Sequence, residues 1–126
     1  MWVRLDNAST VPVFQQLAEQ IRAAIARGAL RPGDSLPSIR QMATEALINP
    51  NTVAKTYRDL EREGILRTQR GLGVFVADGA PRLCHGERRA AIRRQLEVVI
   101  AEGRRAGLTP KELEALCREA LEEGKP

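Results

Sequence analysis

The stretch from residue 36 to residue 77 constrains the fold more than any other part of this 126-residue chain. Its apolar spacing predicts helices over residues 38–47 and 50–63, joined by a short turn. Two short extended runs follow, over Leu66–Gln69 and Val74–Ala77, and the residues between them are basic and rich in glycine. This order predicts a helix-turn-helix followed by a winged hairpin.

Local signals support both predicted helices. Ser38, with Gln41 three residues later, has the form of a capping box at the start of the first helix. Asn49 is a favourable N-cap for the second helix, and Pro50 then occupies its first helical position. Gly64 is placed to end that helix. The turn between the two helices is therefore short and well defined.

A further helix is predicted ahead of this motif, over residues 12–27, with Gly28 as its C-terminal cap. Its apolar residues recur at helical spacing and are Val13, Leu17, Ile21, Ala24 and Ile25. We expect a mainly α fold with one small β-hairpin. A winged helix-turn-helix domain is expected to span residues 11–78.

Residues 79–126 are expected to form a separate two-helix tail, joined to the first domain by a linker at residues 78–81. A segment of 48 residues lies near the lower limit for an independent hydrophobic core. Its first half is rich in arginine and its last helix is rich in glutamate, so pairing between two copies would bring opposite charges together. We therefore predict a dimerisation element whose apolar seam includes Ile92, Leu96, Val99, Leu113 and Leu116.

Charge and composition give broader limits. The net charge of +4 suits a polyanionic partner, although it divides evenly between the two halves of the chain. The first 20 residues contain no secretory apolar segment, and no apolar run is long enough to span a membrane. Two cysteines without metal-type spacing favour a reducing compartment. We expect a cytoplasmic protein.

The two helices of the predicted motif carry side chains suited to double-stranded DNA. In a helix-turn-helix, the N-terminal residues of the second helix meet base edges in the major groove. Asn51 and Thr52 stand there, and an Asn side chain is able to pair with adenine through two hydrogen bonds. Lys55 lies one turn further on, within reach of a base or a phosphate. Arg40, in the preceding helix, suits the DNA backbone or a guanine.

The predicted hairpin adds a second kind of DNA contact. Arg70 and Gly71 at its tip suit a narrow minor groove, where glycine permits close approach and arginine meets an enhanced negative potential. Each of these polar residues, taken alone, also fits an ordinary solvated surface. Their combination on a capped helix, with a basic hairpin at the expected interval, favours DNA binding.

Other chemistry finds little support in the sequence. Cys84 with His85 and the distant Cys117 lack the short ligand spacing of a metal site. The carboxylates around Asp59 have no nucleophile or histidine partner, and Arg-Gly-Leu-Gly is too short for a nucleotide fingerprint. We expect no enzyme activity, no metal and no cofactor.

Residues 11–77 resemble the winged helix-turn-helix domain of the GntR family of bacterial transcriptional regulators. The resemblance is carried by Gly-Ala-Leu-Arg-Pro-Gly-Asp-Ser-Leu-Pro-Ser-Ile-Arg, by Asn-Pro-Asn-Thr-Val-Ala-Lys-Thr-Tyr and by Arg-Gly-Leu-Gly-Val-Phe-Val. The short two-helix tail is similar to that of the YtrA subfamily. The resemblance implies that operator DNA is contacted by Arg40, Asn51, Thr52, Lys55, Arg70 and Gly71.

Departures from the family pattern limit this inference. Many relatives have arginines where Pro50 and Ala54 stand, so base contacts from those arginines do not transfer to this chain. Leu72 occupies a wing position that is often basic or polar in relatives. The wing of this chain is therefore expected to hold DNA through fewer charges.

The favoured function is a homodimeric, sequence-specific DNA-binding regulator, a repressor that reads a pseudo-palindromic operator with half-sites ~34 Å apart. The alternative is a winged-helix module that binds protein or RNA, since fold alone does not determine function. A depleted charge on the second helix would favour that alternative, and the face formed by Asn51, Lys55 and Arg58 does not show it. The tail is too short for an obvious effector pocket within one subunit, so the presence of a small-molecule effector stays open.

Overall fold

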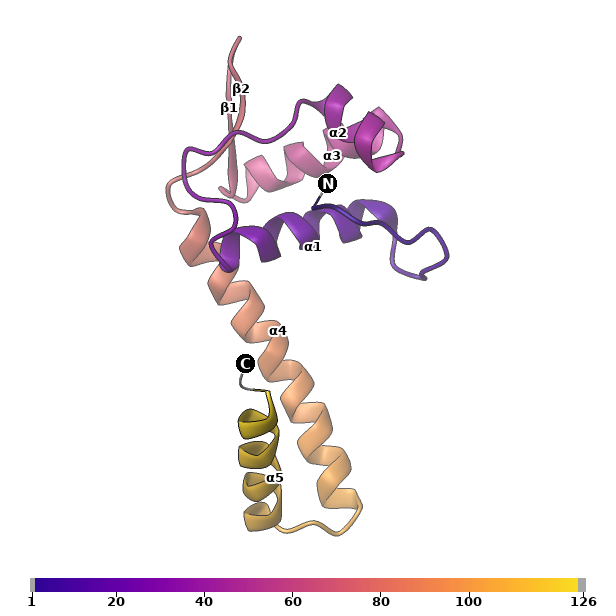
Figure 1. Cartoon of the computed structure of the whole chain (residues 1–126), viewed down its shortest axis with the longest axis vertical. Helices are drawn as coiled ribbons and strands as arrows, with labels where there is room; N and C mark the ends of the chain where they lie inside the picture. The colour runs from indigo at the N-terminus through magenta and orange to yellow at the C-terminus, as the bar shows by residue number, and fades with distance from the viewer. Residues whose placement is uncertain (1, 125–126) are drawn as a thin grey trace. The chain divides into compact units, whose positions relative to one another are not determined.

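The computed structural model describes residues 2–124, which form two compact units that divide between Arg88 and Arg89. The prediction of a mainly helical fold with one antiparallel hairpin is confirmed. The elements in chain order are α1 (Val13–Ala26), α2 (Ile39–Ala46), α3 (Pro50–Arg62), β1 (Leu66–Gln69), β2 (Gly73–Val76), α4 (Ala80–Arg105) and α5 (Pro110–Glu123) (Figure 1). Helix α4 begins in the first unit and ends in the second.

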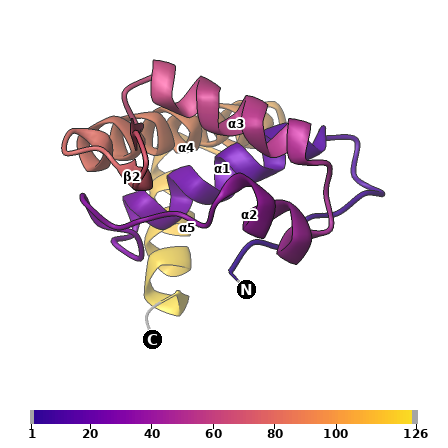
Figure 2. The same ribbon diagram turned by 90° about the horizontal axis from the view of Figure 1, so that it is seen from above.

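The core of the first unit lies where α1, α2 and α3 meet the base of the hairpin. Helices α1 and α3 run side by side in both views (Figure 1, Figure 2). The apolar faces expected from helical spacing are buried because each helix turns its stripe toward the others. The largest fully buried side chains include Leu17, Ile21, Ile25, Met42, Val53, Leu60, Ile65, Leu66 and Val76.

The predicted caps form and fix the helix-turn-helix. The Ser38 hydroxyl accepts from the Gln41 amide at 3.1 Å, and the Ser38 amide donates to Gln41 Oε1 at 3.1 Å. The Asn49 side chain accepts from the Asn51 amide at 2.8 Å, which satisfies an otherwise unpaired donor at the start of α3. The Tyr57 hydroxyl donates to the carbonyl of Pro37 at 2.8 Å and ties α3 to the entry of α2.

The turn between α2 and α3 contains an unexpected residue. Leu47 has φ 57° and ψ 47°, the left-handed conformation that glycine adopts most easily. Among the described residues it is the one non-glycine with a positive φ. Its side chain is 87% exposed, so little packing compensates the steric cost of this conformation, which is about 1–2 kcal/mol.

Replacing Leu47 with Gly is therefore expected to stabilise the protein by about 0.5–1 kcal/mol. Glycine relieves the left-handed strain, and its greater freedom in the unfolded chain offsets only part of that gain. Urea unfolding followed by circular dichroism measures the change. The matched control is Leu72→Gly, also at an exposed leucine but without a positive φ, where a small loss is expected. A loss at both positions would contradict the role assigned to Leu47.

The N-terminal segment packs on the first unit through two glutamines of α1. The amide of Arg4 donates to Gln20 Oε1 at 2.7 Å, and the amide of Asp6 donates to Gln16 Oε1 at 2.8 Å. Gln16 also donates back to the carbonyl of Asp6 at 2.9 Å. This pairing holds Val3 in the core, where it is buried. The segment thus extends the first unit beyond the predicted start at residue 11.

The start of α4 is part of the first unit. Ala80 and Cys84 are fully buried in its core, and burial raises the pKa of the Cys84 thiol to about 11. Instead of a linker at residues 78–81, the chain makes a tight turn that leads directly into the helix. The two compact units divide at Arg88 and Arg89, ten residues beyond the boundary expected from the sequence.

An ionic cluster joins α1, α3 and the start of α4. The guanidinium of Arg22 lies 2.6 Å from Glu63 Oε2, and its Nε lies 3.0 Å from Glu87 Oε2. Burial lowers the pKa of Arg22, but the hydrogen bond to Glu63 and the surrounding carboxylates outweigh burial and raise it. Arg88 pairs with Glu19 at 3.1 Å. These contacts fasten the start of α4 to α1 and to the C-terminal end of α3.

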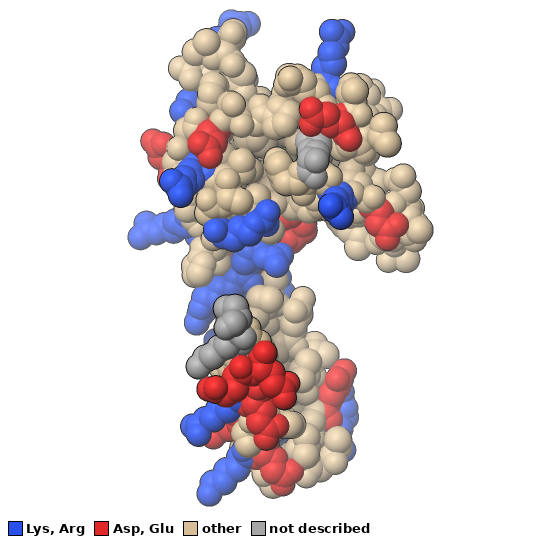
Figure 3. Space-filling model, in the orientation of Figure 1, with Lys and Arg blue, Asp and Glu red and all other residues tan. Residues whose placement is uncertain are grey.

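The second unit is a hairpin of the last part of α4 with α5. Thr109 caps α5, since its hydroxyl accepts from the Glu112 amide at 3.2 Å. A side chain at Gly103 would place Cβ only 2.5 Å from Leu113 Cδ2, so glycine allows the helices to approach closely here. No residue of α5 is buried. In the space-filling view, acidic side chains gather on this unit (Figure 3).

Candidate nucleic-acid interface

The exposed face of α3 presents the residues predicted to read bases. Asn51 and Arg58 are exposed, and Thr52 is partly buried. The backbone carbonyl of Thr52 accepts from the hydroxyl of Thr56 at 2.9 Å, so the carbonyl is engaged while the Thr52 side chain lies at the edge of the exposed face. Asn51 sits in the first turn, where the Asn49 cap fixes the backbone. Its amide side chain is therefore held at the N-terminal end of the helix by a well-defined backbone.

Lys55 lies on the side of α3 that faces α1. Its Nζ donates to Asp59 Oδ2 at 2.9 Å and stands 4.3 Å from the centre of the Phe14 ring. The hydrogen bond from Lys55 lowers the pKa of the Asp59 carboxyl, and Arg62 adds a second ion pair at 3.0 Å. Lys55 must exchange these partners before it binds a phosphate. The sequence did not reveal this intramolecular pairing.

Arg40 lies on α2 beside an apolar hollow. Its side chain is exposed, in the first turn of α2. The hollow lies at the junction of α2 with the start of α3 and is lined by Ile39, Arg40, Ala43, Thr44, Ile48 and Pro50. Sequence reasoning missed this feature because the hollow forms only where α2, the turn after it and the start of α3 pack together. Helical spacing predicts that Ile39 is buried with Met42 and Ala43, whereas its side chain is 38% exposed in the structure.

The wing is a short hairpin with an open tip. Strands β1 and β2 pair from Leu66 with Val76 to Gln69 with Gly73, and residues 33–36 run along the other side of β2. Gly71 has φ +79°, and a Cβ atom added there would meet no atom within 4 Å, so the tip is free for close approach. Arg70 is exposed, and Leu72 beside it is 70% exposed.

Arg67 adds a cation to the wing that the sequence did not single out. Its guanidinium lies 5.2 Å from the centre of the Phe75 ring on the paired strand, and one of its nitrogens donates to Gln69 Oε1 at 3.2 Å. Phe75 and Gln69 hold the arginine along the hairpin. The wing therefore carries two arginines, at positions 67 and 70.

Features typical of other kinds of site are few in residues 2–124. No cluster of three His, Cys, Asp or Glu side chains suited to a metal ion occurs there. Cys84 is buried and Cys117 is exposed, and both are free thiols. No helix in that range is both long and apolar enough to cross a membrane.

Two short helices joined by a tight turn, an exposed polar face on the second and a glycine-tipped hairpin define a winged helix-turn-helix protein. The family model described as "Bacterial regulatory proteins, gntR family" matches residues 14–76. This chain belongs to the GntR family and is a DNA-binding transcriptional regulator.

Individual relatives agree with this membership. The HTH-type transcriptional repressor YtrA of Bacillus subtilis is 35% identical over 117 residues, which cover 93% of this chain and 90% of that protein. A transcriptional regulator from Oenococcus oeni matches with a TM-score of 0.81 at 31% identity, covering 93% of this chain and 97% of that one. AraR(DBD) in complex with operator ORE1 matches with a TM-score of 0.52 at 27% identity, covering 58% and 89%.

Proposed function

We propose that the protein is a homodimeric repressor that reads a pseudo-palindromic operator with one recognition helix per half-site. The observation that carries this proposal is the exposed Asn51 in the first turn of a capped α3, together with the exposed Arg40 in the first turn of α2. The proposed DNA contacts are Arg40, Asn51, Thr52, Lys55, Arg70 and Gly71.

These residues divide by the kind of contact they suit. Asn51 offers both a donor and an acceptor to a base edge in the major groove, and Thr52 offers a hydroxyl beside it. Arg40 and Lys55 suit phosphates, which position a protein on the duplex without reading its sequence. Gly71 lets the backbone of the wing approach a minor groove, where Arg70 would meet the negative potential.

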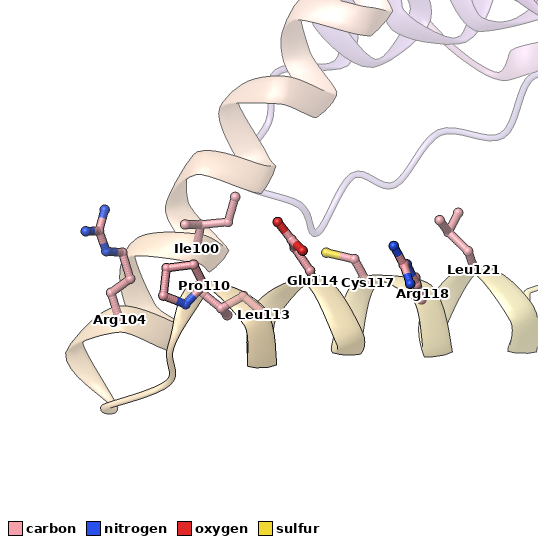
Figure 4. A pocket seen from close by; sticks show the side chains of 8 residues that line it. All are labelled: Ile100, Arg104, Pro110, Leu113, Glu114, Cys117, Arg118 and Leu121. Carbon is pink, nitrogen blue, oxygen red and sulfur yellow. The ribbon is translucent and has the colours of Figure 1, made fainter.

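Dimerisation is supported by the apolar surface of the second unit. The seam residues Ile92, Leu96, Val99 and Leu116 are all about half exposed. No residue of α5 is buried within the chain, and contiguous exposed apolar patches mark protein interfaces. A groove lined by Ile100, Leu113, Cys117 and Leu121 continues the apolar surface between the two helices (Figure 4).

Charge gives less support to pairing between copies. Since α5 runs antiparallel to α4, its glutamate-rich end returns toward the arginine-rich start of the unit within one chain (Figure 1). The opposite charges therefore approach each other without a partner, and the proposal rests on the apolar seam. Repression, rather than activation, is proposed by analogy with the Bacillus subtilis relative, which is named an HTH-type transcriptional repressor.

Replacing Asn51 with Ala tests the base-reading role. We expect operator affinity to fall by about 1–3 kcal/mol, with a relaxed preference at one base position, while binding to random DNA changes little. Gel shifts on both duplexes at one fixed salt concentration measure this, because the phosphate contribution depends steeply on salt. The matched control is Asn7→Ala, at an exposed asparagine in the N-terminal segment. Equal losses on operator and random DNA would show that Asn51 reads no base.

A further inference from the structure

The hollow between α2 and α3 adjoins the proposed base-reading residues and differs from them in chemistry. Ile39, Ala43, Ile48 and Pro50 give it apolar walls, and the arginine at its rim is Arg40. Ile39 and Pro50 are exposed, so the hollow opens to solvent at the N-terminal end of α3. The surface that would enter a major groove is therefore partly apolar.

The first turns of α3 carry no cation of their own before Lys55. Pro50, Val53 and Ala54 are apolar, and Asn51 and Thr52 are neutral. A guanine presents two acceptors in the major groove and is read by arginine or lysine, whereas thymine presents a 5-methyl group that apolar side chains contact. The apolar wall beside this neutral polar pair fits the methyl group of thymine, and the one cation that lines the hollow is Arg40, which is assigned to a phosphate.

We propose that this hollow receives the 5-methyl group of a thymine in each half-site, next to the base read by Asn51. The inference rests on the proposed operator reading by α3. Pro50 is the principal contact, because its ring is exposed at the first helical position of a helix whose start is fixed by the Asn49 cap. The ring is rigid, so ordering it against the methyl group costs little side-chain entropy. Ile39 also lines the hollow and is 38% exposed.

The test begins with the operator, obtained by selecting bound sequences from random duplexes. Each half-site thymine is then replaced singly by deoxyuridine, which removes only the methyl group and keeps every hydrogen-bonding atom. At one position per half-site we expect the affinity of the wild-type protein to fall about fourfold, the effect of one buried methyl-sized group. In a second pair of duplexes, the T·A pair at that position is exchanged for C·G, with either cytosine or 5-methylcytosine. The duplex with 5-methylcytosine restores the methyl group and should regain part of the lost affinity.

Two variants assign the effect to the hollow. Pro50→Ser keeps a residue tolerated in the first turn of a helix and removes the ring, so it should bind the thymine and deoxyuridine operators equally. Pro32→Ser makes the same exchange at another exposed proline, in the loop between α1 and α2, and should keep the fourfold preference.

The outcomes separate this inference from the proposed function. Tight operator binding without a methyl-sensitive thymine overturns the inference and leaves operator reading intact. A preference that persists in Pro50→Ser also overturns it, because the methyl group then lies elsewhere. If Pro50→Ser fails to fold, the deoxyuridine scan of the wild-type protein still decides whether such a thymine exists. Failure to select any sequence refutes the proposed function itself.

Discussion

Replacing Leu96 with Glu is expected to turn the protein into a monomer and to weaken operator binding by about 100-fold or more. Leu96 is 48% exposed in α4, at the middle of the predicted seam. A carboxylate there would have to be desolvated at an apolar interface between two copies, which is strongly unfavourable. Without the partner, the second recognition helix loses the high effective concentration that a dimer gives it at the second half-site.

Val98→Glu is the matched control for this prediction. Val98 is 58% exposed in the same helix, and two residues of helical rotation place it nearly opposite Leu96. Sedimentation of the two variants at equal concentration measures the oligomeric state, and gel shifts measure the affinity. The control should remain a dimer with wild-type affinity. An intact dimer for Leu96→Glu, or equal effects of both changes, would rule out the proposed seam.

Local sequence signals were sufficient for the elements that hold the interface. The Ser38 capping box, the Asn49 cap and Pro50 each act within a few residues, and the observed helices begin where these residues place them. The hairpin was equally predictable, because Gly71 and Gly73 provide the positive φ angles at its tip. Interactions of this short range can be recognised without knowledge of the tertiary structure.

Contacts between distant segments were not predictable in the same way. Gln20 binds the backbone of Arg4, and Arg22 pairs with Glu63 and Glu87. In the sequence these glutamine and arginine residues look like ordinary polar positions on an amphipathic helix. The same limit explains the domain boundary, since the burial of Cys84 depends on its packing against the first unit.

In the candidate site, some features were predictable from the sequence and others were not. Helical spacing identified the face that contains Asn51 and Lys55, but it did not reveal that Lys55 is paired with Asp59 and stacked on Phe14. Nor did it reveal the hollow beside Pro50, whose walls come from two helices and the turn between them. Periodicity assigns a residue to a face, and only tertiary packing decides what that residue meets there.

Replacing Leu60 with Ala should remove about 2–5 kcal/mol from the free energy of unfolding. Leu60 is fully buried on α3, on the side of the helix opposite Asn51, and belongs to the core that α3 shares with α1. The lost methyl groups leave a cavity that the close-packed core closes only in part. Total stability is typically about 5–15 kcal/mol, so the loss is a large fraction of it.

Any effect of Leu60→Ala on DNA binding should come from the lower stability of the fold and not from the loss of a DNA contact. Leu60→Ala leaves the exposed face of α3 unchanged, so its operator affinity at low temperature should stay near that of the wild type. On heating, the variant should lose operator binding at a lower temperature than the wild type, because its first unit unfolds earlier. Leu72→Ala is the matched control, since the same atoms are removed from a side chain that is 70% exposed at the wing tip, and it should shift stability by no more than about 0.5 kcal/mol. Urea unfolding at equal protein concentration compares the two, because the apparent stability of a dimer depends on concentration. Equal stability of the two variants would mean that α3 is not held in place by the core beneath it.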